Sequence, residues 1–111
     1  MIPQVRPSEF NAWLQQQAER PLVLDVREPW EVQLASVAPD AFDLVAIPMN
    51  QIPARLAELP QDRPIACLCH HGARSQRVAL FLAHQGYTDV ANIAGGIDAW
   101  SQERDPGIPR Y

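Results

Sequence analysis

Short apolar runs alternate with helix-like segments along the whole chain. Four runs, at 22–26, 44–47, 65–68 and 90–93, consist largely of valine, isoleucine, leucine and alanine. They are too short to form helices and are apolar on both faces, which is typical of buried parallel strands. A further short strand is predicted over 3–6.

Between these runs, apolar residues recur at helical spacing. We expect helices beginning at Pro7, with Ser8 as N-cap, and over 28–34, 52–59, 73–85 and 97–102. The pattern is strongest over 73–85, and Gly86 follows it as a typical C′ residue. Strands that alternate with helices predict an α/β fold, with a five-stranded, mostly parallel sheet covered by helices on both faces.

Composition narrows the class of protein. The 111 residues suffice for one domain, 1–111, and 47% of them are apolar, the usual share for a globular chain. The net charge of −4 gives no basic footprint for nucleic acid, and no apolar run approaches the ~20 residues that span a bilayer. For these two reasons we expect neither nucleic-acid nor membrane partners. Because the N-terminus lacks the pattern of a signal peptide, we also expect a cytoplasmic protein.

The segment IACLCHHGARS, residues 65–75, combines a strand end, a thiol and the start of the strongest helix. In parallel α/β sheets, ligands bind at the carboxyl ends of the strands, and Cys69 lies at such an end. A helix N-terminus carries about half a positive charge and unpaired N–H groups. That environment favours the thiolate, which is the nucleophilic form of cysteine.

Two further loop residues suggest which anion the site accepts. Arg74 adds a positive charge, and Gly72 lets the backbone bend so that several N–H groups point inward as an anion cradle. Four residues separate Cys69 from Arg74, one fewer than in cysteine-dependent phosphatases. The shorter loop fits one terminal sulfur atom on Cys69 better than a phosphoryl group.

Three separated motifs resemble the single-domain rhodanese family of sulfurtransferases: LVLDVREPWE at 22–31, CHHGARS at 69–75 and NIAGGIDAW at 92–100. The resemblance implies a rhodanese-like fold in which Cys69 is catalytic and carries a persulfide. The implied active-site loop consists of His70, His71, Gly72, Ala73, Arg74 and Ser75. Arg74 is expected to support this loop and attract the donor, and Ser75 to cap or start the next helix.

The resemblance also implies the reaction partners. The donor would be thiosulfate or a persulfide, the acceptor a thiol or cyanide, and a sulfur-relay protein is a further candidate partner. No cofactor or metal is implied. Asp25 and Arg27 are expected to have a structural role before any catalytic one. They could support the active-site side of the sheet, or they could form a structural ion pair without any functional role. Residues 35–46 depart from the Gly-His-Ile-Pro-Gly turn that is usual in the family.

Several residues have simpler interpretations. Cys67 could be a small buried residue or a resolving thiol for Cys69. Cys67, Cys69, His70 and His71 are all zinc-ligand types, but they lack the second ligand pair of a structural site. We expect both histidines to project from the loop rim toward solvent. Arg74 could merely pair with a surface carboxylate.

Two other functions compete with the sulfurtransferase. One is a non-catalytic interaction module with the same fold, and the other is a cysteine-dependent phosphatase or arsenate reductase. The enzyme hypothesis requires that the Cys69 side chain be open to solvent and that the loop amides close around its sulfur.

Overall fold

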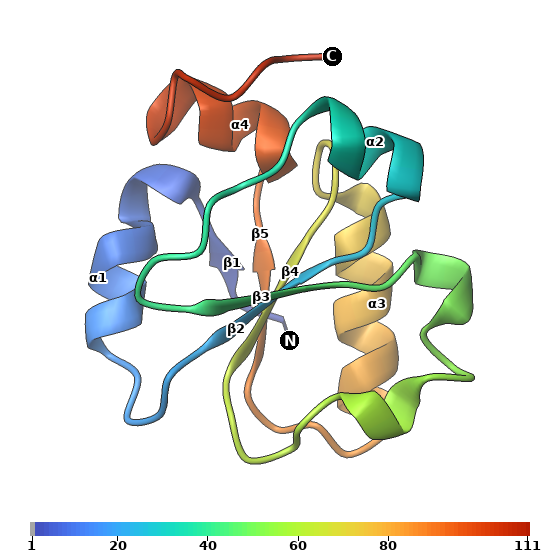
Figure 1. Cartoon of the computed structure of the whole chain (residues 1–111). Coiled ribbons are helices and arrows are strands. Elements are labelled where there is room, and N and C mark those ends of the chain that lie inside the picture. The colour runs from blue at the N-terminus through green and yellow to red at the C-terminus, as the bar shows by residue number, and fades with distance from the viewer. Residues whose placement is uncertain (1) are drawn as a thin grey trace.

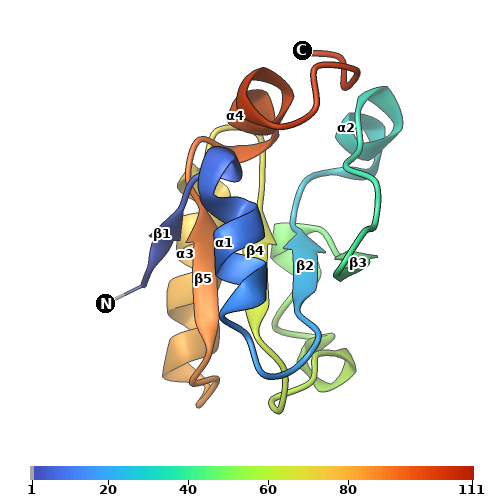
Figure 2. The ribbon, with the colours of Figure 1, turned by 90° about the vertical axis from the view of Figure 1, so that its left-hand side faces the viewer.

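The computed structural model describes residues 2–111. Its sheet has five parallel strands in the order β1-β5-β4-β2-β3, visible from left to right in Figure 2. The strands are β1 (Gln4–Val5), β2 (Leu22–Asp25), β3 (Asp43–Ala46), β4 (Ile65–Leu68) and β5 (Val90–Ile93). The predicted α/β fold with a parallel five-stranded sheet is confirmed.

Helices cover both faces of this sheet. They are α1 (Phe10–Gln15), α2 (Pro29–Leu34), α3 (Ala73–His84) and α4 (Gly96–Glu103), with 3-10 helices η1 (Pro7–Glu9), η2 (Met49–Gln51) and η3 (Leu56–Glu58). Figure 1 shows α1 and α4 on one side of the sheet and α3 on the other, together with η2 and η3. None of the helices within residues 2–111 is long and apolar enough to cross a bilayer.

Strand alternation divides the core into two layers. In β4, Ile65 and Cys67 point toward α3, whereas Ala66 and Leu68 point toward α1 and α4. The second layer is aromatic, because Phe10, Phe42 and Trp100 pack together with ring centroids 5.1–6.0 Å apart. Successive strand residues face opposite sides of a sheet, so each apolar run serves both layers.

Two predicted helix features are wrong. The expected helix over 52–59 is instead a series of turns followed by the 3-10 helix η3 (Leu56–Glu58). Isolated stretches of this length are marginal as α-helices, and propensity alone does not decide their form. Ser8 is not an N-cap: Arg6 has that position before η1, and its N–H donates to the Glu9 carboxylate. By contrast, Gly86 has a φ of 95° just after α3, as its predicted place at the helix end requires.

The divergent segment 35–46 packs against the aromatic layer. Val37 and Phe42 are buried there, and β3 occupies the segment's end at the sheet edge. The segment leads from α2, which lies with α4 at the end of the sheet where the strands finish (Figure 2). The central strand β4 finishes at this same end of the sheet, and Cys69 is the residue that follows it.

Candidate active site

Cys69 follows the last residue of β4 and lies inside the turn that leads to α3. Its sulfur accepts a hydrogen bond from the Gly72 N–H, with N···Sγ 3.1 Å, and lies 3.2 Å from the Ser75 hydroxyl oxygen. Only 1% of the residue is exposed. The expectation that this side chain is open to solvent is therefore wrong for this conformation, in which the turn closes over the thiol.

Ser75 connects the thiol to the neighbouring strand. Its hydroxyl lies 2.6 Å from Asn92 Oδ1 on β5, while Asn92 Nδ2 donates to the Gly72 carbonyl oxygen at 3.2 Å. Ser75 is fully buried in the first turn of α3, so of the expected cap or helix start it takes part in the start only, and Gly72 is the N-cap. A hydroxyl has one proton, so Ser75 can donate either to Asn92 or to the Cys69 sulfur, but not to both.

The Gly95-Gly96 pair forms the support beneath the turn. The Ile97 and Asp98 N–H groups donate to the Cys69 and His70 carbonyl oxygens, at 2.8 and 3.2 Å. A Cβ atom on Gly96 would lie 2.3 Å from the His70 oxygen, so no side chain fits there. This close backbone approach explains why a glycine pair stands at the start of α4.

Gly72 permits the turn itself. It is the N-cap of α3 with a φ of 106°, a conformation that favours glycine. The first intrahelical bond runs from the Gln76 N–H to the Gly72 oxygen, so the amides of 73–75 lack helical partners. Among residues 2–111, the N–H found donating to Sγ is that of Gly72. The ring of several amides around the terminal sulfur of a persulfide stays a prediction.

Arg74 forms an ion pair that sequence reasoning did not identify. Its guanidinium donates to both Glu31 carboxylate oxygens on α2, at 2.6 and 2.9 Å. The Arg74 hydrogen bond is the largest cause that lowers the pKa of Glu31 to about 2, and Glu31 in turn raises the pKa of Arg74. One interpretation of the sequence pairs Arg74 with a carboxylate at the surface. Arg74 does pair with a carboxylate, but Glu31 is buried.

Tyr111 joins this ion pair to a second one. Its hydroxyl donates to Glu31 Oε2 at 2.7 Å and accepts from Arg27 Nη1 at 3.0 Å. Arg27 is itself paired with Asp25 in full burial, at 2.7 Å between Nη2 and Oδ2. Burial raises the pKa of Tyr111 to about 12, so the phenol remains a neutral donor near pH 7.

Asp25 and Arg27 hold the backbone at this edge of the sheet. Besides its pairing with Asp25, the Arg27 guanidinium donates to the carbonyl oxygens of Glu31 and Ala35, at 3.2 and 2.8 Å. These bonds fix α2 and the start of segment 35–46. The ion pair is thus present, and its supporting role at the site stays a prediction.

The two histidines have different surroundings. The His70 ring lies between those of His71 and Tyr111, with both centroid distances 3.9 Å, whereas His71 is exposed. The expectation that both project to solvent is therefore right for His71 only. Burial, followed by the neighbouring His71, lowers the pKa of His70 and favours its neutral form.

One group of side chains has metal-ligand composition. Ligand atoms of His70, His71 and Asp98 lie within 4.8 Å of one another. The two imidazoles are stacked, and the Asp98 carboxylate already accepts hydrogen bonds from Arg110. A cation at this group would therefore compete with that guanidinium for Asp98. Cys67 lies deep in the core, where burial raises the pKa of its thiol and disfavours a reactive thiolate.

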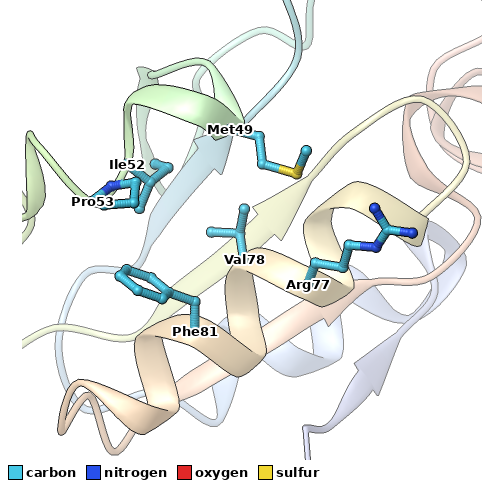
Figure 3. Close-up of a pocket in the computed structure, with 6 residues that line it drawn as sticks. All are labelled: Met49, Ile52, Pro53, Arg77, Val78 and Phe81. Carbon is cyan, nitrogen blue, oxygen red and sulfur yellow. The ribbon is translucent and has the colours of Figure 1, made fainter.

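A separate apolar cavity of about 160 Å³ lies between η2 and α3. Figure 3 shows side chains from both segments facing each other across it. Its lining consists of Met49, Ile52, Pro53, Arg77, Val78 and Phe81. None of these belongs to the turn 69–75, so the cavity is distinct from the Cys69 site.

Comparison with known proteins places this geometry in a family. The family model for the rhodanese-like domain matches residues 7–103. A sulfurtransferase from Allochromatium vinosum is 41% identical over 88 residues, which cover 79% of this chain and 76% of that protein. The thiosulfate sulfurtransferase GlpE from Vibrio cholerae is 33% identical over 84 residues, covering 76% of each chain.

A solved structure agrees along nearly the whole length. The rhodanese-related protein from Thermoplasma volcanium superposes with a TM-score of 0.78 at 27% identity, over 98% of this chain and 99% of that one. Fold, sequence relatives and the cysteine turn at the edge of the sheet lead to the same conclusion. The chain belongs to the rhodanese-like domain family, whose relatives include named sulfurtransferases.

Proposed function

We propose that this protein is a sulfurtransferase that carries a sulfane sulfur as a persulfide on Cys69. The observation that carries the proposal is the placement of the Cys69 sulfur at the N-terminus of α3, where the Gly72 N–H donates to it. The partly positive helix end and the unpaired amides of 73–75 suit a terminal sulfur anion. The named relatives support transfer of sulfur, and one of them supports thiosulfate as a donor.

The proposed reaction has two balanced steps. The Cys69 thiol loses its proton to solvent, and the thiolate attacks the outer sulfur of thiosulfate. The new S–S bond forms as that of thiosulfate breaks, and sulfite leaves with the electron pair. An acceptor thiolate or cyanide then attacks the outer sulfur, takes it as a persulfide or thiocyanate, and restores the Cys69 thiolate.

The chain's own residues divide the work. Ser75 can turn its hydroxyl proton from Asn92 toward the sulfur when the thiol ionises, because its oxygen lies within reach of both atoms. Arg74 supports the turn by pairing with Glu31, because Nη1 and Nη2 of its guanidinium each donate a hydrogen bond to that carboxylate. The requirement that Cys69 be open to solvent is not met in this conformation, because the residue is 1% exposed. The proposal therefore needs the turn to open before a donor reaches the sulfur.

Intact-protein mass spectrometry after thiosulfate treatment tests the proposal. We expect the added mass of one sulfur atom, removed by cyanide and missing in Cys69→Ser. Cys67→Ser is the matched control, because it removes the neighbouring buried thiol, and it should still gain the sulfur. If neither thiosulfate nor a small persulfide loads the wild-type protein, the enzyme proposal fails.

The buried thiol also favours a second candidate, a non-catalytic module that kept the family fold. A module of this kind would leave Cys69 unmodified by both donors, and Cys69→Ser would leave its cellular function intact. The same mass measurement therefore separates the two functions. Hydrolysis of a phosphate ester by the wild-type protein would instead point to the phosphatase alternative, which the short Cys69–Arg74 interval disfavours.

A further inference from the structure

The segment that follows α4 is tied down before it reaches the Cys69 turn. The Ser101 hydroxyl donates to the Ile108 carbonyl oxygen at 2.6 Å, and the Ile108 side chain is buried in the aromatic layer. Arg110 Nε then donates to Asp98 Oδ1 at 2.8 Å. These contacts hold the segment against α4 and place Tyr111 beside the turn 69–75.

Tyr111 contacts both sides of that turn. Its ring stacks on His70, the residue after Cys69, with centroids 3.9 Å apart and an interplanar angle of 7°. Its hydroxyl donates to Glu31, which holds Arg74 at the other side of the turn. One side chain thus connects positions 70 and 74, which flank a thiol that is 1% exposed.

We propose that Tyr111 is a specificity-determining latch that keeps the turn closed over Cys69 and limits the site to small sulfur donors. This rests on the proposed function, because it names the class of donor for the same sulfur. Thiosulfate needs little opening to bring its outer sulfur to Cys69. A bulky donor such as glutathione persulfide requires the stack of Tyr111 on His70 to separate.

The first experiment measures access without sulfur transfer. Alkylation of Cys69 by iodoacetamide, followed by peptide mass spectrometry, gives the accessibility of this thiol. An aromatic stack and a hydrogen bond of this kind correspond to roughly 5- to 150-fold in a rate, so Tyr111→Ala should alkylate faster by about that factor. Tyr111→Phe keeps the ring and should lie between Tyr111→Ala and wild type.

The second experiment measures selectivity. Tyr111→Ala should raise kcat/KM for glutathione persulfide relative to thiosulfate, by up to the same factor if the latch energy is realised in full. Merely loosening the fold would lower both values together. Tyr87→Phe is the matched control, because it also removes a tyrosine hydroxyl, one that donates to Leu56 and Leu59 carbonyl oxygens away from the site.

The outcomes separate the two proposals. Equal alkylation rates in Tyr111→Ala and wild type, or an unchanged donor ratio, would overturn the latch. A similar increase in alkylation for Tyr87→Phe would also overturn it, by assigning the effect to general loosening. If no donor loads Cys69, the sulfurtransferase proposal fails, while the alkylation rates still decide whether Tyr111 closes the turn.

Discussion

Gly96→Ala tests whether backbone contact with α4 holds the cysteine turn in place. An added Cβ would lie 2.3 Å from the His70 oxygen and 2.5 Å from the Cys69 oxygen. Both are backbone atoms, so they cannot move aside as a flexible side chain would. The turn has to lift away from α4, which endangers the bonds from the Ile97 and Asp98 N–H groups.

The expected loss of stability has two parts. Alanine at a φ of +62° is strained by roughly 1–2 kcal/mol. Each of the two weakened hydrogen bonds adds about 0.5–1.5 kcal/mol. Gly96→Ala should therefore lower the free energy of unfolding by about 2–5 kcal/mol. It should also slow persulfide formation, because Cys69 moves with its carbonyl group.

Gly86→Ala provides the matched control. Gly86 also has a positive φ, 95°, but a Cβ there would meet nothing within 4 Å. It should lose only the backbone part, about 1–2 kcal/mol, and load sulfur like the wild type. Urea unfolding and mass spectrometry measure the two effects. Equal stability losses for both variants, with Gly96→Ala still fully active, would refute the account of the glycine pair.

Three further variants test the charged and polar network. Glu31→Gln should destabilise by about 1–3 kcal/mol at pH 7. The folded-state pKa of Glu31 is depressed to about 2 from 4.5. The difference in unfolding free energy between wild type and Glu31→Gln should therefore be complete above about pH 5 and fade as pH falls toward 2. An equal difference at pH 7 and pH 3 would contradict the ion pair. Ser75→Ala should slow single-turnover persulfide formation about 10- to 100-fold if the hydroxyl stabilises the ionised sulfur, whereas an unchanged rate removes that role. Asp25→Asn leaves the buried Arg27 charge uncompensated and should lose about 3–5 kcal/mol in urea unfolding. The exposed-pair control Glu58→Gln should lose under about 1 kcal/mol, and equal losses would contradict the burial argument.

Local patterns predicted the strands because each run is short and apolar on both faces, as a strand buried between two helical layers must be. The bounds of β4 and β5 match the apolar runs, and β4 led directly to Cys69 at the edge of the sheet. The glycine pair was identified as a motif, but its cause is a close approach to His70 between segments distant in sequence. Spacing alone cannot reveal such an approach.

The missing site residues depend on packing between distant segments. Glu31 lies 43 positions before Arg74, and Tyr111 lies 80 positions after Glu31. A signal for Glu31 existed, since its short helix follows β2 and ends up at the same sheet edge as Cys69. Nothing in the irregular segment after α4 indicated Tyr111, because its place depends on the Ser101 and Asp98 anchors. Burial of Cys69 likewise depends on how tightly the turn closes.

The edge strand β1 has a consequence for how the chain matures. Gln4 is in register with Asn92, so the first strand finds its place only when the last strand is available. Asn92 also contacts Ser75 and Gly72, and the turn rests on amides at 97 and 98. During synthesis, Cys69 emerges from the ribosome well before these supports do. The nascent thiol therefore remains unprotected until about thirty further residues have been added, and closure of the long-range β1–β5 pairing is a late event in folding.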